Sequence, residues 1–204
     1  MKRIAILGST GSIGVQSLDV IAEFPDQFSV HSLTADTQIE RLKKQIAAFK
    51  PRMVAVKDEE NVKGLPSYQG ELTVHTGIDG LVDVVTHPDV DLVISAIPGS
   101  AGFIPTLRAI EAGKSVALAN KELLVMAGEI IMNAARKSGV DIIPLDSEHI
   151  AIHQCLAGQN LDDVQRLILT ASGGPFLHSN RDHMEKMSPA EALEDYQKKG
   201  LMAP

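Results

Sequence analysis

The first fourteen residues contain a short apolar run followed by three evenly spaced glycines. The run is RIAIL at 3–7, and Gly8, Gly11 and Gly14 follow it. This order predicts a strand, a tight turn and a helix, a geometry that brings backbone N–H groups and a helix N-terminus to a pyrophosphate. The spacing differs from GxGxxG, so by itself it leaves open a plain turn with Ser12 as the helix N-cap.

The same alternation continues along the chain. Further apolar runs alternate with stretches of helical pattern and lie at 28–33, 53–56, 71–76, 91–97, 115–119 and 140–145. Short buried strands between helices predict an α/β fold, a doubly wound and mostly parallel sheet of the Rossmann-like kind. We expect a dinucleotide-binding domain over 1–145. Residues 146–204, where the rhythm changes, are expected to begin a second, α+β domain that is incomplete.

Composition excludes several classes of function. The 204 residues are 44% hydrophobic, carry a net charge of −7 and contain 3% aromatic residues with no tryptophan. No lysine or arginine run stands out, so neither nucleic acid nor an anionic membrane is an expected partner. The chain has a single cysteine and no apolar run near the roughly 18 residues of a membrane span, so we expect a cytoplasmic protein.

The glycine turn follows the first strand of the expected sheet, and this position strengthens its interpretation as a cofactor site. Ser9, Thr10 and Ser12 would add hydroxyl donors to the turn. Asp36 ends the second expected strand, where an acidic residue binds a ribose 2′-hydroxyl and favours NAD. A loop or helix-capping role for Asp36 is an equal alternative.

Two more polar groups follow expected strands at the carboxyl edge, where open sheets bind ligands. Asn120, Lys121 and Glu122 follow 115–119, although, taken alone, Asn120 as a helix cap and Glu122 beside the helix dipole explain them better than a ligand site does. Asp146 and Glu148 follow 140–145. If the chain is still extended there, both carboxylates project to one side and suit Mg²⁺ or Mn²⁺. The alternative is acidic residues in a first helical turn.

Later residues are less specific. His149 and His153 lie one helical turn apart but lack the order of a zinc-protease motif, which favours surface or packing roles. Ser172, Gly173 and Gly174 end the apolar run at 166–172 and form a loop that can present a hydroxyl and backbone donors to a phosphate. A plain turn is as good an interpretation of that loop.

Four segments together carry a resemblance to a known family: GSTGSIG at 8–14, ALANKE at 117–122, DSEH at 146–149 and SGGPF at 172–176. In this order and spacing they resemble 1-deoxy-D-xylulose 5-phosphate reductoisomerase, over the chain to about residue 193. The resemblance implies an NADPH-binding first domain and a second, catalytic domain that holds a divalent metal (Mg or Mn) and a phosphorylated sugar. The implied reaction converts 1-deoxy-D-xylulose 5-phosphate to 2-C-methyl-D-erythritol 4-phosphate in non-mevalonate isoprenoid synthesis, and the implied assembly is a homodimer.

The resemblance also assigns residues by position. The implied cofactor-binding residues are Thr10, Gly11, Ser12, Ile13, Asn120 and Glu122. The implied substrate-binding residues are Lys121, Ser147, Glu148 and Ser172, of which Lys121 and Glu148 are catalytic. Asp146 and Glu148 are the implied metal ligands.

Three departures from the family pattern bear on function. Where the family commonly has a glycine and a basic or amide pair, this chain has Asp36, Thr37 and Gln38. This difference leaves open whether the cofactor is NADPH or NADH. Leu123 and Ile150 stand where the family has polar residues, and we expect the site to tolerate the loss of those polar side chains. The family chain is about twice as long and carries a lid, a further phosphate-binding stretch and a third metal carboxylate beyond this amino-terminal half. We therefore expect cofactor binding with little or no activity, the alternative being a non-catalytic nucleotide-binding module or scaffold.

Overall fold

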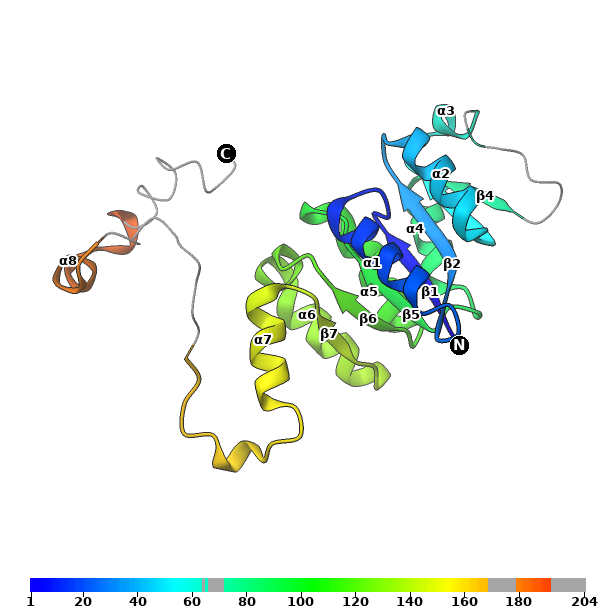
Figure 1. The fold of residues 1–204 in the computed structure, drawn as a ribbon. Coiled ribbons are helices and arrows are strands. Elements are labelled where there is room, and N and C mark those ends of the chain that lie inside the picture. The colour runs from blue at the N-terminus through cyan, green and yellow to red at the C-terminus, as the bar shows by residue number, and fades with distance from the viewer. Residues whose placement is uncertain (64, 66–71, 169–178, 192–204) are drawn as a thin grey trace. The chain divides into compact units, whose positions relative to one another are not determined.

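The computed structural model describes residues 1–63, 65, 72–168 and 179–191 (Figure 1). The chain divides into two compact units, Met1–His153 and Gln154–Pro204. The first unit holds the whole sheet and all of the site residues considered below except Ser172. The domain boundary expected at residue 145 stays a prediction.

Within the described residues, one seven-stranded sheet has the order β4-β3-β2-β1-β5-β6-β7, and every neighbouring pair is parallel. The strands are β1 (Lys2–Leu7), β2 (Phe28–Ala35), β3 (Met53–Val56), β4 (Thr73–Thr76), β5 (Leu92–Ser95), β6 (Ser115–Leu118) and β7 (Ile142–Pro144). The chain winds outward from β1 in both directions. The doubly wound parallel sheet expected from the sequence is confirmed.

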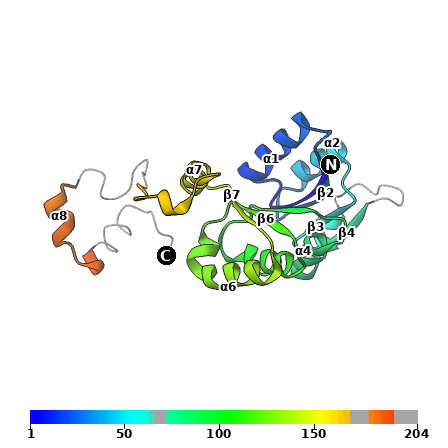
Figure 2. The same ribbon diagram turned by 90° about the horizontal axis from the view of Figure 1, so that it is seen from below.

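Helices cover both faces of this sheet (Figures 1 and 2). On one face lie α1 (Ser12–Glu23) and α2 (Ile39–Phe49), and on the other α4 (Gly77–Thr86), α5 (Phe103–Glu111) and α6 (Glu122–Ser138). Further helices are α3 (Glu59–Val62), α7 (Ser147–Leu156) and α8 (Arg181–Lys186), with 3-10 turns η1 (Gly99–Gly102) and η2 (Leu161–Asp163).

The apolar runs of the strands are continuous because each strand feeds two cores. In β1, Ala5 and Leu7 pack against α4, α5 and α6, whereas Ile4 and Ile6 pack against α1 and α2. Alternate side chains of a strand point to opposite faces, so a strand covered on both sides needs apolar residues at every position. Each fully buried aliphatic side chain contributes about 1.5–3 kcal/mol relative to an exposed one.

Two local expectations differ from the structure. The residue before α1 is Gly11, and Ser12 is the first helical residue rather than the N-cap. Residues 166–168 are not in a strand, and the rest of the expected strand at 166–172 lies outside the described residues. Among the described residues, no helix combines the length and the apolar character that crossing a membrane requires.

Candidate nucleotide and metal sites

The turn between β1 and α1 requires glycine at two of its three glycine positions. Gly8 has φ of +79°, and a Cβ there would lie 2.9 Å from the carbonyl oxygen of Ala96. A Cβ on Gly14 would overlap the backbone of Gly8 and Ser9. At Gly11 a Cβ would only reach ordinary contact, 3.4 Å from the oxygen of Gly8. The first and third glycines therefore pack the turn against its neighbours, and Gly11 leaves the turn open to a ligand.

Side-chain hydrogen bonds hold the turn in place. The backbone N–H of Gly8 donates to Thr34 Oγ1 at 2.8 Å, and Gln45 Nε2 donates to the Ser9 carbonyl at 2.8 Å. The Ser9 hydroxyl is fully buried, 2.8 Å from Gln45 Oε1 and 3.0 Å from the Thr34 carbonyl. The expectation that Ser9 offers a hydroxyl to a ligand is therefore wrong, because that hydroxyl is used to fix the turn.

The first turn of α1 is open to an anion. No side chain in the described part of the chain caps this helix at Gly11. Thr10 and Gly11 line the cleft described next, while Ser12 and Ile13 are the first two residues of α1. Unpaired N–H groups and the positive end of the helix dipole together attract phosphate. The expected cofactor-binding residues of this turn therefore lie together at the N-terminus of a helix.

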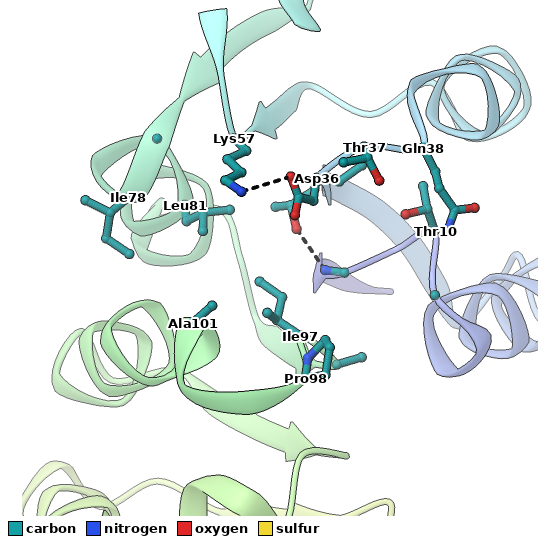
Figure 3. A pocket seen from close by; sticks show the side chains of 16 residues that line it. Thr10, Asp36, Thr37, Gln38, Lys57, Ile78, Leu81, Ile97, Pro98 and Ala101 are labelled. Carbon is teal, nitrogen blue, oxygen red and sulfur yellow. Dashed lines mark hydrogen bonds and ion pairs between the residues drawn. The ribbon is translucent and has the colours of Figure 1, made fainter. Parts of the chain in front are cut away.

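A cleft of about 520 Å³ opens beside this turn at the carboxyl edge of the sheet (Figure 3). Its walls come from the ends of β1, β2, β3 and β5 and the start of α4. The lining residues are Gly8, Thr10, Gly11, Thr34, Ala35, Asp36, Thr37, Gln38, Lys57, Gly77, Ile78, Leu81, Ala96, Ile97, Pro98 and Ala101. The cleft lies at the switch point between β1 and β5, which is where doubly wound sheets bind ligands.

One basic residue of this cleft was missed from the sequence. Lys57 follows β3, and Asp36 follows β2. The Nζ atom of Lys57 lies 3.8 Å from Oδ1 of Asp36 (Figure 3). Both side chains are exposed. The signal in the sequence was available, because Lys57 comes directly after the apolar run at 53–56 as Asp36 does after its own strand. The pair therefore puts a carboxylate, which suits a ribose hydroxyl, next to an ammonium group, which suits a 2′-phosphate.

Asn120 closes the neighbouring part of this edge. Its Nδ2 donates to the carbonyl oxygens of Ile97 at 2.5 Å and Gly99 at 2.8 Å, so the amide ties the end of β6 to the loop after β5. Its side chain therefore does not cap α6, and the capping alternative is wrong. Asn120 Oδ1 is buried without a partner among the described residues. A buried acceptor of this kind is fitted to receive a hydrogen bond from a ligand.

Lys121 and Asp146 meet at the ends of the neighbouring strands β6 and β7. Lys121 Nζ lies 3.0 Å from Asp146 Oδ2. This hydrogen bond is the main cause that raises the pKa of Lys121 and lowers the pKa of Asp146. Asp146 is mostly covered and Lys121 is exposed. Asp146 is therefore held as a carboxylate at the edge of the sheet.

The region of Asp146 and Glu148 is helical, not extended. Because α7 begins at Ser147, the argument that alternation places both carboxylates on one side does not apply. The hydroxyl of Ser147 donates to Glu148 Oε2 at 2.8 Å, and His149 Nδ1 lies 3.9 Å from Asp146 Oδ1. Glu148 is still close enough to contribute to the lowered pKa of Asp146. The two carboxylates form an incomplete set of hard oxygen ligands, since no three-ligand cluster that contains them occurs among the described residues.

Of the two remaining expected site residues, only Glu122 lies in the part of the chain that the structure describes. Glu122 is the first residue of α6 and is exposed, beside Lys121. Ser172 lies outside the described residues. The structure thus brings the glycine turn, Asn120 and the pair of Lys121 and Asp146 to one edge of the sheet.

A doubly wound parallel sheet with this turn and cleft defines an α/β protein of the Rossmann-like class, in which the cleft at the switch point is the usual place for a nucleotide. The family model for 1-deoxy-D-xylulose 5-phosphate reductoisomerase matches residues 4–128, and the model for the C-terminal domain of that enzyme matches residues 142–198. The chain belongs to the 1-deoxy-D-xylulose 5-phosphate reductoisomerase family. The resemblance of its four segments to that family is confirmed.

Individual relatives agree with the family models. The 1-deoxy-D-xylulose 5-phosphate reductoisomerase of Bacillus cereus (strain Q1) is 47% identical over 193 residues, which are 95% of this chain and 51% of the relative. The enzyme of Zymomonas mobilis, solved in complex with NADPH, is 36% identical with a TM-score of 0.79 over 95% of this chain and 51% of that chain. A DOX-P reductoisomerase with NADPH, fosmidomycin and magnesium is 35% identical, with a TM-score of 0.77 over 94% and 50%. The chain spans about half the length of the relatives it matches.

Proposed function

We propose that this chain is the cofactor-binding half of an NADPH-dependent reductoisomerase that converts 1-deoxy-D-xylulose 5-phosphate to 2-C-methyl-D-erythritol 4-phosphate in the cytoplasm. The observation that carries the proposal is the cradle at the carboxyl edge of the sheet. Gly8 and Gly14 pack the turn, the start of α1 is uncapped, and Asn120 offers a buried acceptor. These features fit a dinucleotide whose pyrophosphate lies at α1.

The residues of the cradle bind and orient the cofactor. The N–H groups of Ser12 and Ile13 would receive the pyrophosphate, while the N–H of Gly11 donates to the Gly8 carbonyl and its missing side chain leaves room for the phosphate. Asn120 Oδ1 would accept a hydrogen bond from the far end of the dinucleotide. The pair of Asp36 and Lys57 would face the ribose that carries the 2′-group, with Lys57 as the cation for a 2′-phosphate. When bound, the nicotinamide supplies the hydride.

Asp146 and Glu148 fit a divalent metal by their chemistry, since hard carboxylate oxygens suit Mg²⁺ or Mn²⁺. Such an ion supplies Lewis acidity toward two neighbouring oxygens of a sugar. Lys121 keeps Asp146 ionised and would place its ammonium beside an anionic substrate, and Ser147 orients Glu148. The described residues bring only these two carboxylates together, so we expect the chain alone to bind cofactor and to be weakly active or inactive.

Calorimetric titration of the purified chain with NADPH, and separately with NADH, tests the first half of this proposal. We expect saturable binding of NADPH, with weaker binding by a Gly14→Ala variant whose turn cannot close. A chain that binds neither dinucleotide would contradict the cofactor role. Measurable turnover of 1-deoxy-D-xylulose 5-phosphate by the 204-residue chain would contradict the expected loss of activity.

The second candidate is a nucleotide-binding module without catalysis, favoured by the incomplete set of metal ligands. Fosmidomycin distinguishes the two, because a related structure holds it together with magnesium. Magnesium-dependent binding of fosmidomycin that is lost in an Asp146→Asn, Glu148→Gln double variant supports the reductoisomerase. Binding of NADPH with no such effect supports the module.

A further inference from the structure

A second cluster of possible metal ligands lies at the amino edge of the sheet, away from the cleft. It contains His31 in β2, His87 directly after α4 and Asp89 in the loop that leads to β5. One potential ligand atom from each residue lies within 4.8 Å of the others. The rings of His31 and His87 have centroids 4.6 Å apart. The three residues come from segments that the fold alone brings together.

His31 presents an unused nitrogen lone pair to this cluster. The residue is 3% exposed, and its Nδ1 lies 2.8 Å from Ser32 Oγ. The Ser32 hydroxyl gives its single proton to the Val84 carbonyl at 3.1 Å, so Nδ1 of His31 is the donor to Ser32. The neutral ring then carries its lone pair on Nε2, which is buried with no partner among the described residues. A metal-binding histidine has this arrangement, with one nitrogen donating to the protein and the other free.

The other two residues are also oriented by their neighbours. Arg3 Nη1 lies 2.6 Å from Asp89 Oδ1 and holds that carboxylate in place. The backbone N–H of Asp89 donates to His87 Nδ1 at 3.1 Å. An ion bound to Nδ1 of His87 would use the lone pair that now accepts this hydrogen bond. An ion bound to Nε2 of His87 would require the ring proton to move from Nε2 to Nδ1. Hydrogen bonds to the ligands from an outer shell are typical of metal sites.

The charged groups around the cluster are three cations, Arg3, Arg52 and Lys114, and two carboxylates, Asp89 and Asp91. Arg3 pairs with both Asp89 and Asp91. Lys114 donates to the carbonyls of Pro88 and Val90 beside the same loop, and the backbone of Arg52 donates to that of His31. A metal ion at this site would therefore find little unpaired negative charge. Its ligands would be mainly two imidazole nitrogens. Such a set selects Zn²⁺-type ions, which bind nitrogen well, over the hard ion Mg²⁺.

We propose that His31, His87 and Asp89 bind one Zn²⁺-type ion, with water as a fourth ligand, and that this ion joins β2 to the loop after α4. Tetrahedral zinc with ligands at about 2.0–2.1 Å requires ligand atoms roughly 3.4 Å apart, so the side chains have to close slightly around the ion. The site is separate from Asp146 and Glu148 and does not depend on the proposed reaction.

Titration of the chelator-treated chain with Zn²⁺ and with Co²⁺ tests this site, by calorimetry and by the visible absorption of tetrahedral Co²⁺. We expect one ion to bind and to raise the melting temperature, because an ion that binds only the folded state stabilises it. A His87→Ala variant is expected to lose at least about 10-fold in affinity, the smallest loss that even outer-shell changes cause. His75→Ala, which removes a histidine from β4, is the matched control and should keep the affinity.

Two further measurements distinguish this site from Zn²⁺ binding elsewhere on the chain. The Asp146→Asn, Glu148→Gln variant should bind Zn²⁺ as the unchanged chain does, whereas loss of binding there would overturn the proposal. In the unchanged chain, the ¹⁵N resonance of His31 Nε2 should shift when Zn²⁺ binds, which needs no variant to fold. A chain that binds no Zn²⁺, or whose His31 resonance is unaffected, would also overturn it.

Discussion

The two edges of the sheet differ in how their polar groups are used. At the carboxyl edge, the start of α1 and Asn120 Oδ1 have no partner among the described residues, and a cleft opens beside them. At the amino edge, Arg3 pairs with Asp89 and Asp91 at the starts of β1 and β5, although Nε2 of the buried His31 has no partner among the described residues. Helices that follow parallel strands direct their N-termini to the carboxyl edge, so open donors gather there. We therefore expect ligands to bind where the fold leaves polar groups without partners.

The largest expected effect comes from closing the glycine turn. Gly14→Ala places a Cβ against the backbone of Gly8 and Ser9, so the turn must shift. We expect a loss of about 1–3 kcal/mol in the free energy of unfolding, as overpacking causes, together with a large loss of NADPH affinity. Urea unfolding and calorimetry measure the two effects.

Gly11→Ala is the matched control for this change, since its Cβ would lie at ordinary contact distance. Stability should then change little while NADPH affinity falls, because the added methyl group lies beside the expected pyrophosphate. Equal loss of stability in the two variants would contradict the roles assigned to the two glycines.

Removing the side chain of Asn120 should have the next largest effect. Asn120→Ala leaves the carbonyls of Ile97 and Gly99 without their shared donor and removes the open acceptor. We expect a loss of about 1–3 kcal/mol in stability and a lower affinity for NADPH. Thermal unfolding and titration measure both, with Asn133→Ala on α6 as control. An unchanged affinity would remove Asn120 from the cofactor site.

The exposed pair of Asp36 and Lys57 should have a smaller effect that changes cofactor preference. Lys57→Ala is expected to weaken NADPH binding by about 2–5-fold and to leave NADH binding nearly unchanged, since an exposed charge contact contributes about 0.2–1 kcal/mol. Asp36→Ala should strengthen NADPH binding relative to NADH. Titrations of each variant with both dinucleotides at low and high salt measure the preference. If neither variant changes the preference for NADPH over NADH, this pair does not contact the 2′-phosphate or the 2′-hydroxyl of the cofactor.

The smallest effect is expected at the amino edge, and it depends on pH. Three hydrogen bonds from Arg3, two from its guanidinium and one from its backbone N–H, lower the pKa of Asp91 to about 2. Because the pKa is lower in the folded state, this contact stabilises the protein above the ordinary pKa of aspartate, and the contribution is lost as the pH falls through about 2. Arg3→Met should raise the pKa of Asp91 and flatten the acid limb of the stability curve. NMR titration of the Asp91 carboxyl measures this, and an unchanged pKa would contradict it.

The parts of the fold and site that follow from local pattern could be predicted. The strand, turn and helix at 3–23 and the six later strands follow from apolar periodicity and glycine placement, because those patterns act within a few residues. The polar groups after the strands at 115–119 and 140–145 could also be assigned to one edge. Asn120 was found this way, although its actual partners, Ile97 and Gly99, could not be.

Other features depend on contacts between distant segments. The use of the Ser9 hydroxyl by Thr34 and Gln45, and the approach of Lys57 to Asp36, join residues that local pattern does not connect. The helical start at Ser147 also differs from the extended segment that was assumed for Asp146 and Glu148. Side-chain partners of this kind are set by strand order and register, which a single sequence does not contain.

The sequence by itself determined the doubly wound α/β class, the glycine turn and the family, because strand and helix periodicity and the four motifs are properties of short segments. The tertiary structure alone decided which polar atoms remain open. It left Asn120 Oδ1 and His31 Nε2 buried without partners among the described residues, and it paired Asp146 with Lys121. The physical reason is that hydrogen bonding at a buried atom depends on every segment packed around it, and those segments come from all parts of the chain.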